Sequence, residues 1–192
     1  MNRLVFYHGA MNSGKSLQLL AFAAKLRNKN IPYLVVKPST DTRDGAFIAS
    51  RPLDEKLPCM LWKPDEWFDT NELYKIKYIL VDEAQFMTSK QVAYLASIVD
   101  SDAFDITVIC YGLRTDFRTQ LFEGSKRLFE LADEIHEIDD KDIDAEGNKV
   151  IINARIVDGK VTLEGPQVVI GVEDKYLSMS RKEFYQKLPD EL

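Results

Sequence analysis

The sequence predicts an α/β fold: a parallel sheet flanked by helices and followed by a small C-terminal β domain. Three observations support this fold class. The apolar residues 4–7 precede a glycine-rich segment, which is followed by apolar residues at helical spacing. Further apolar segments alternate with helical patterns up to residue 138, as in a parallel sheet. Beyond it, Asp158-Gly159 lies between two β-prone runs, which is a strong hairpin signal.

The element order can be proposed from these patterns. A strand, a helix that follows the glycine-rich segment and a second strand imply a right-handed crossover. We place the further core strands and helices at residues 33–37, 66–74, 78–81, 89–99, 106–110, 125–132 and 134–138, and treat 38–60 as loop with short apolar runs. We expect a core domain at residues 1–138 and a small domain at 139–192, with extended segments at 149–157, 160–163 and 167–171.

The glycine-rich segment fits the pattern Gly-x-x-x-x-Gly-Lys-Ser/Thr of a phosphate-binding P-loop. Backbone N–H groups of such a loop face the phosphates, and the following helix N-terminus adds a favourable dipole. We expect Lys15 to reach the β- and γ-phosphates and the Ser16 hydroxyl to bind Mg²⁺. A chance match is the alternative, and the strand and helix on either side argue against it. The predicted phosphate-binding residues of this loop are Gly9, Ala10, Met11, Asn12, Ser13, Gly14, Lys15 and Ser16.

An acidic pair follows the apolar segment at residues 78–81. Asp82 is placed as the carboxylate that helps to hold Mg²⁺ beside a P-loop, and Glu83 is placed to act as a general base. The plainer interpretation is that Asp82-Glu83 only marks the end of a strand.

Composition narrows the class of protein. The chain has 192 residues and a net charge of −6 without a basic cluster, which argues against nucleic-acid binding. No apolar run approaches the length that spans a membrane. Cys59 and Cys110 are far apart, which favours two reduced thiols in a cytoplasmic protein. The isolated His8 and His136 argue against a histidine metal site.

Apolar side chains and an arginine occur where ligands bind in an open parallel sheet, on loops beyond the carboxyl ends of the strands. One interpretation is a ring-shaped group enclosed by apolar side chains, with the arginine near a phosphate. The other is that the aromatic residues only anchor their loops to the core. The residues concerned are Met11, Phe86, Leu113, Phe117 and Arg118.

Several motifs together resemble the type II thymidine kinases, the cytosolic class. They are Gly-Ala-Met-Asn-Ser-Gly-Lys-Ser at 9–16, Val-Asp-Glu-Ala-Gln-Phe at 81–86 and Tyr-Gly-Leu-Arg-Thr-Asp-Phe-Arg at 111–118. Residues 41–43 and 48–51 look like two more of its motifs, and residues 168–176 resemble the thymidine-binding lasso. The resemblance covers most of the chain, in order. It implies that the parallel sheet is of the P-loop, RecA-like kind and that the small C-terminal β domain is a lasso domain.

The resemblance implies transfer of the γ-phosphate of ATP to the 5′-hydroxyl of thymidine, with Mg²⁺. It implies that Glu83 is the general base and that Ser16 and Asp82 bind Mg²⁺. Arg118 would lie near the phosphates, and the default assembly is a homotetramer. The implied thymidine-binding residues are Met11, Phe86, Leu113, Phe117, Val169, Gly171 and Tyr176.

One departure from the family concerns zinc, which usually holds the lasso through paired cysteines. No cysteine follows Cys110, and the expected positions fall within 142–147 and at Ser180 and Glu183. We therefore expect no zinc. A surface ion pair from Arg181 or Lys182 would add at most about 1 kcal/mol, so we expect apolar packing by Val150, Ile151, Ile152, Ile156, Val161, Phe184, Tyr185 and Leu188 to replace the metal.

Two other functions are compatible with the sequence. The lost zinc ligands would suit a catalytically silent nucleotide-binding regulator, although Lys15, Ser16, Asp82 and Glu83 are all present. Another P-loop ATPase, in which Glu83 activates water, is the second alternative.

Overall fold

The computed structural model describes residues 2–42, 44–50, 53–138, 143–167 and 176–188. Its main element is a six-stranded sheet in the order β5-β2-β6-β7-β1-β8, in which all five strand pairings are parallel. The predicted parallel sheet is therefore confirmed. The strands are β1 (Leu4–Gly9), β2 (Tyr33–Pro38), β5 (Met60–Trp62), β6 (Tyr78–Val81), β7 (Thr107–Leu113) and β8 (Glu134–Glu137).

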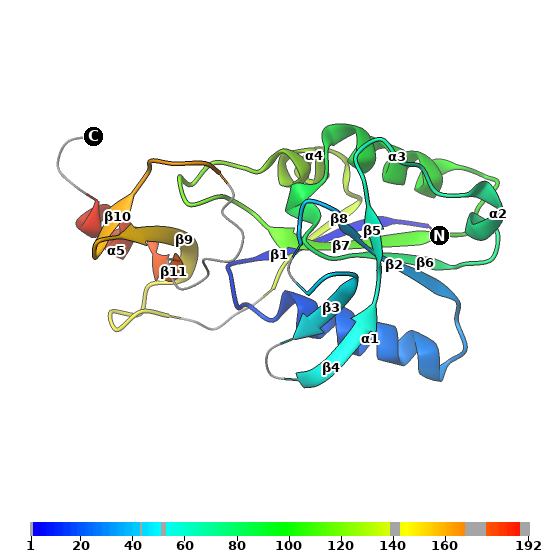
Figure 1. Ribbon diagram of the computed structural model, residues 1–192, viewed down its shortest axis with the longest axis horizontal. Helices are drawn as coiled ribbons and strands as arrows, with labels where there is room; N and C mark the ends of the chain where they lie inside the picture. Colours follow the sequence, from blue (N-terminus) through cyan, green and yellow to red (C-terminus); the bar gives the residue numbers. More distant parts are fainter. Residues whose placement is uncertain (1, 43, 51–52, 139–142, 168–175, 189–192) are drawn as a thin grey trace.

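Helices and a hairpin cover the two faces of this sheet (Figure 1). On one face lie α1 (Lys15–Asn28) and the hairpin of β3 (Phe47–Ser50) and β4 (Leu53–Pro58); on the other lie α3 (Ser89–Asp100) and α4 (Glu123–Leu131). Successive strand residues enter opposite apolar clusters, as Leu80 does between Ile79 and Val81. Continuous apolar strands with both faces buried are typical of parallel sheets.

The segment expected to be loop at residues 38–60 is more ordered than predicted. It contains the β3–β4 hairpin, and β5, from Met60, forms the edge of the main sheet beside β2. The described residues of 38–62 alternate less clearly because only a few are buried: Ile48 packs in the cluster with α1, and Trp62 is fully buried. The predicted helix at 66–74 is shorter, because α2 covers only Thr70–Leu73.

The C-terminal part forms a separate antiparallel sheet in the order β10-β9-β11. The predicted hairpin is confirmed: Asp158 and Gly159, both with positive φ, connect β9 (Val150–Val157) to β10 (Lys160–Thr162). The sequence analysis missed β11 (Tyr176–Ser180) and α5 (Arg181–Lys187). Of the predicted extended run 167–171, residues 168–171 lie outside the described residues.

Phe184 of α5 packs with Ile152, Val161 and other residues of this sheet in a small apolar cluster, which agrees with the packing expected to replace zinc. Ile151, Ile156 and Leu188 pack against its border, whereas Tyr185 is 60% exposed and contributes little. Cys59 and Cys110 are both free thiols, as predicted. Among the helices that the structure describes, none has the length and apolar character needed to cross a bilayer.

Candidate active site

The P-loop connects the end of β1 to the start of α1. Asn12 and Gly14 have positive φ angles of 65° and 80°, so the loop uses the left-handed conformation that glycine adopts most readily. Lys15, which is 9% exposed, folds back over the loop, where its Nζ donates to the Ala10 carbonyl and lies 3.3 Å from Ser13 Oγ. The ammonium group is therefore held over the loop expected to bind phosphates.

Ser16 and Asp82 meet although they are far apart in the sequence. The Ser16 hydroxyl donates to Asp82 Oδ2 at 3.0 Å, which joins the start of α1 to the end of β6 across the intervening β7. Burial, and then the charge of Glu83, raise the pKa of Asp82, whereas the Ser16 hydrogen bond lowers it. A hydroxyl and a carboxylate side by side are oxygen ligands of the kind that Mg²⁺ takes together with phosphate oxygens. In the described part of the chain, no three His, Cys, Asp or Glu side chains are grouped to hold a metal unaided.

Glu83 adopts a conformation that is uncommon for a residue with a side chain. Its φ of 50° and ψ of 38° are left-handed, and it immediately precedes the 3₁₀ helix η1 (Ala84–Phe86). Residues in such conformations cluster at active sites, where the surrounding structure holds them. The backbone therefore supports the prediction that Glu83 has a functional role.

Gln85 holds the Glu83 carboxylate in place, a contact that the sequence analysis missed. Its side-chain Nε2 donates to Glu83, and its Oε1 accepts from the Leu113 backbone N–H at 3.0 Å. Gln85 is 2% exposed, and a Cβ on Gly112 would lie 2.9 Å from its Oε1. This amide links the expected base to the end of β7.

Gly124 allows α4 to approach η1 closely. A Cβ at this position would lie 2.4 Å from the Ala84 carbonyl oxygen and 2.8 Å from that of Met87, and both atoms are backbone. The backbone that follows Glu83 thus rests directly on the first turn of α4.

We therefore expect Gly124→Ala to destabilise the protein. Alanine would favour the helix by about 1 kcal/mol, but overpacking a tight site typically costs about 1–3 kcal/mol. The overlap with two carbonyl oxygens makes the overpacking cost the larger effect. Urea unfolding measures the difference, with Lys126→Ala on the exposed face of the same helix as the control. A Gly124→Ala protein as stable as wild type would contradict the close packing.

Two of the residues expected to bind thymidine meet directly. The rings of Phe117, after β7, and Tyr176, at the start of β11, pack edge to face with centroids 6.5 Å apart. Phe117 is 2% exposed, and the guanidinium groups of Arg118 and Arg155 lie 5.0 and 5.5 Å from the centre of its ring. Gln167 also reaches this loop, with its Nε2 3.0 Å from Asp116 Oδ2. The small sheet and Gln167 thus contact the loop after β7.

The other predicted residues are placed less closely together. Met11 is bound to the small sheet through its backbone N–H, which donates to Asn153 Oδ1 at 2.8 Å. Phe86 packs edge to face against Phe122, with ring centroids 5.7 Å apart, so it also anchors its own loop. Leu113 lies at the end of β7, where Gln85 binds its backbone. Val169 and Gly171 lie outside the described residues.

In the described part of the chain, the contacts of Arg118 are with Phe117, Asp116 and Gly165 rather than with the P-loop. Its guanidinium donates to the Gly165 carbonyl and stacks on Phe117, while its backbone N–H donates to Asp116 Oδ1 at 2.9 Å. The buried Arg118 Nε has no hydrogen-bond partner among the described residues. Its expected place near the phosphates therefore stays a prediction.

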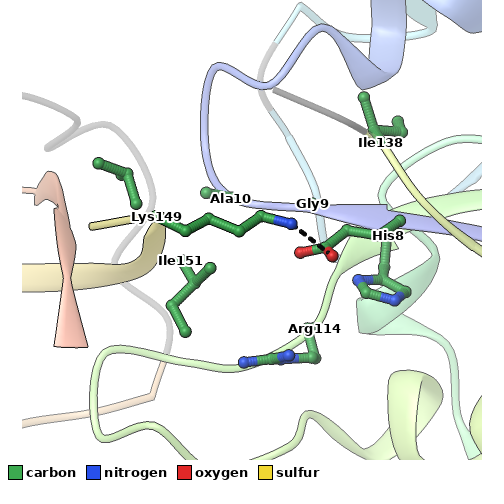
Figure 2. Close-up of a pocket in the computed structure, with 9 residues that line it drawn as sticks. His8, Gly9, Ala10, Arg114, Ile138, Lys149 and Ile151 are labelled. Atoms are coloured by element: carbon green, nitrogen blue, oxygen red, sulfur yellow. Dashed lines mark ion pairs between the residues drawn. The ribbon is translucent and has the colours of Figure 1, made fainter. Parts of the chain in front are cut away.

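A small pocket lies where the core meets the start of β9 (Figure 2). Lys149 extends across it and pairs with Glu137 at 2.6 Å. Burial lowers the pKa of His8 at its edge, while the Glu137 charge acts in the opposite direction. Gly9 and Ala10 of the P-loop also line this pocket, so it lies beside the P-loop at the junction between the core and the start of β9, where an ion pair of the chain itself crosses it.

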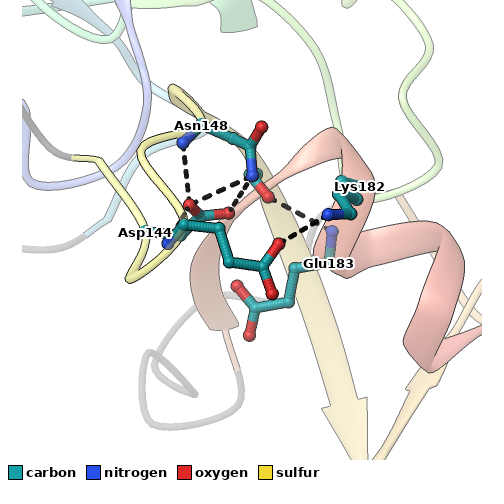
Figure 3. A network of polar contacts seen from close by, with 6 residues as sticks. Asp144, Asn148, Lys182 and Glu183 are labelled. Atoms are coloured by element: carbon teal, nitrogen blue, oxygen red, sulfur yellow. Dashed lines mark hydrogen bonds and ion pairs between the residues drawn. The ribbon is translucent and has the colours of Figure 1, made fainter.

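Polar contacts are found at the positions that correspond to the zinc ligands of the family (Figure 3). A hydrogen bond from Ser180, followed by contacts from Asn148 and nearby backbone, lowers the pKa of Asp144 to about 2. Ser180 Oγ also accepts from the Glu183 backbone N–H at 3.2 Å and so caps α5. Lys182 pairs with Glu146 at 2.7 Å. The loop before β9 is therefore joined to α5 by hydrogen bonds and an ion pair.

Comparison with known proteins agrees with this geometry. The family model described as thymidine kinase matches residues 2–184. The thymidine kinase of Enterobacteria phage T4 is 39% identical over 190 residues, which cover 95% of each chain. That of Haemophilus influenzae (strain 86-028NP) is 37% identical over 193 residues, covering 97% of this chain and 98% of that protein. That of Xanthomonas oryzae pv. oryzae (strain MAFF 311018) is 37% identical over 191 residues, covering 96% and 90%.

The P-loop, the Ser16–Asp82 contact and the left-handed Glu83 agree with a family match over nearly the whole length of the chain. The chain therefore belongs to the thymidine kinase family.

Proposed function

We propose that this protein is an ATP-dependent thymidine kinase, which transfers the γ-phosphate of ATP to the 5′-hydroxyl of thymidine to give dTMP. The observation that carries the proposal is the junction of Ser16 and Asp82 at 3.0 Å, directly followed by Glu83 in its constrained conformation. A metal-binding pair and a base at the mouth of one P-loop are the parts that phosphoryl transfer to a hydroxyl requires.

Each part of the reaction has a residue suited to it. Lys15 lies over the P-loop and can exchange the Ala10 carbonyl for phosphate oxygens. Ser16 and Asp82 would hold Mg²⁺, which neutralises charge on the phosphates when bound. Glu83, oriented by Gln85, would accept the proton of the 5′-hydroxyl. The nucleoside would lie toward Phe117 and Tyr176, which join the core to the small sheet.

A labelling assay tests the function. Purified protein, Mg²⁺ and γ-³²P-labelled ATP are incubated with and without thymidine, and labelled dTMP is separated from free phosphate. Label in dTMP that depends on thymidine is expected. Phosphate release that thymidine does not change would instead support a P-loop ATPase, and ATP binding without either product would support a silent regulator.

We also propose that the lasso part of this kinase is held without zinc. Zinc prefers four thiolate or imidazole ligands, whereas the contacts that join the loop before β9 to α5 come from Asp144, Glu146, Ser180 and Lys182. The apolar cluster around Phe184 adds packing beneath them. Elemental analysis of purified protein is expected to find no stoichiometric zinc, and Mg²⁺ alone should restore activity after EDTA. About one zinc per chain, or recovery that needs zinc, would contradict this proposal.

The organisation of the chain remains a proposal of the same kind. The separate apolar cluster of the small sheet supports a core domain at residues 1–138 and a lasso domain at 139–192. The family resemblance supports a homotetramer in the cytoplasm, and light scattering of the purified protein tests the assembly. A monomer at micromolar concentration would contradict it.

A further inference from the structure

We propose that Asn153 and Ser178 are positioning residues that couple the nucleoside site to the P-loop. They do so by binding the backbone of one P-loop residue, Met11, from the small sheet. This inference rests on the proposed function, because it concerns the binding of thymidine and ATP at the same site.

The contacts involve both polar groups of the Met11 backbone. Its N–H donates to Asn153 Oδ1 at 2.8 Å, and its carbonyl oxygen lies 3.4 Å from the Ser178 hydroxyl. The same hydroxyl lies 3.4 Å from Asn153 Oδ1, so the two side chains also contact one another. Because a backbone N–H can only donate, the Met11 contact also fixes which end of the Asn153 amide faces the loop.

Strand register explains why these two side chains act together. Asn153 on β9 and Ser178 on β11 are direct cross-strand partners, and the neighbouring pair is Ile152 with Met179. Ile152 and Met179 point into the small apolar cluster, so Asn153 and Ser178 point to the opposite face of the sheet. That face would be solvated in an isolated hairpin, yet Asn153 is only 4% exposed. The P-loop thus donates a backbone N–H to a polar side chain that is buried on this face.

Met11 lies between two functional parts of the loop. The preceding residue, Ala10, provides the carbonyl that accepts from Lys15, and the following residue, Asn12, has the left-handed φ of 65°. A shift of the Met11 peptide groups would therefore move the backbone that is expected to bind phosphates. The Asn153 and Ser178 contacts hold that backbone in one position.

The same strand also reaches the aromatic pair, Phe117 and Tyr176, that we expect to bind the nucleoside. β11 begins at Tyr176, which packs against Phe117, and Ser178 follows two residues later. A ligand that orders Tyr176 therefore also favours the position of Ser178 and, through it, that of the P-loop. Coupling between two sites is reciprocal, so ATP must strengthen thymidine binding by the same factor as thymidine strengthens ATP binding.

Equilibrium binding tests the coupling without catalysis. The dissociation constant of thymidine is measured by calorimetry in Mg²⁺, with and without a saturating β,γ-imido analogue of ATP. We expect the analogue to tighten thymidine binding in wild type by about 5- to 150-fold, the usual range of coupling. Asn153→Leu has a similar volume but no hydrogen-bond acceptor. In this variant the analogue should change the thymidine dissociation constant by no more than about twofold. Ser178→Ala should reduce the coupling factor partially.

Two further variants separate positioning from a general loss of structure. Asn153→Asp keeps an acceptor for the Met11 N–H and should retain most of the coupling. Ser97→Ala removes a hydroxyl that, among the described residues, donates to the Tyr94 carbonyl of its own helix, and it should leave the coupling factor unchanged. Thermal unfolding of each variant shows whether the fold is intact, and Ser178→Ala carries the test if Asn153→Leu does not fold.

Several outcomes would overturn the inference. A coupling factor as large as in wild type in folded Asn153→Leu or in Ser178→Ala would show that the contacts do not transmit the coupling. Wild-type protein that binds both ligands independently would also overturn it, while leaving the proposed function intact. Wild-type protein that binds no thymidine would overturn the proposed function and this inference together.

Discussion

Glu83→Gln is expected to bind ATP normally and to lose about 10²–10⁴-fold in kcat, the usual contribution of a positioned general base. Glutamine has nearly the same shape as glutamate but cannot accept the proton of the 5′-hydroxyl. The left-handed backbone at Glu83 should tolerate the change, because the two side chains differ only at their end. The loss should therefore appear in turnover rather than in the KM for ATP.

The measurement is steady-state kinetics with thymidine and ATP varied separately. Glu130→Gln is a matched control, because Glu130 is exposed on α4 and, within the described ranges, pairs with Arg127 at 2.7 Å. The control should retain wild-type kcat. A Glu83→Gln protein within about threefold of wild type would remove Glu83 from the role of base, since that is far below the expected effect.

The P-loop and its neighbours were predictable because their information is local. Residues 4–16 carry a strand, a glycine turn and a helix start in one continuous pattern, and the structure places them in that order. The acidic pair was predictable for the same reason, since it directly follows the apolar strand β6. The contact of Ser16 with Asp82 then follows from the topology of a parallel sheet, whose carboxyl ends meet at one edge.

The positioning residues were not predictable, because their partners are distant in the sequence. Gln85 binds Leu113, which is 28 residues away, and Asn153 binds Met11 across 142 residues. A lone glutamine after an acidic pair, or an asparagine within an apolar strand, has no local pattern that indicates its partner. The signal for such a positioning residue would be a buried polar side chain on the face of β9 that the sequence pattern exposes to solvent. Burial is known only once the strands are packed.

Short and terminal elements were missed for a different reason. The edge strand β5 has three residues and pairs only with β2, so too few positions are buried to give a periodic pattern. The strand β11 lies just after residues 168–175, and its alternation covers five residues. The expectation that Tyr185 helps to close the lasso is met only in part, because α5 turns Phe184 inward and leaves Tyr185 exposed, with one edge-to-face contact to Phe184.

The largest effect on substrate choice is expected between thymidine and purine deoxynucleosides. Phe117 is fully enclosed between Tyr176 and the guanidinium groups of Arg118 and Arg155, so this side chain has little freedom to move outward for a second ring. Met11 on the P-loop side is fixed through its backbone by Asn153. We expect Phe117 and Met11 to bound the pyrimidine site, and two side chains anchored in this way should exclude the larger base.

The expected result is a kcat/KM for thymidine on the order of 10⁴-fold above that for deoxyguanosine, because sites built on buried hydrogen bonds reject analogues that leave those groups unpaired. Deoxycytidine is the matched control for size, since it separates rejection by volume from rejection by hydrogen bonding. Phe117→Ala removes the aromatic ring on one side of the site. It should lower the ratio of kcat/KM for thymidine to kcat/KM for deoxyguanosine, by raising the rate with the purine and lowering the rate with thymidine. Comparable rates on deoxyguanosine and thymidine in wild type would show that these side chains do not define a pyrimidine site.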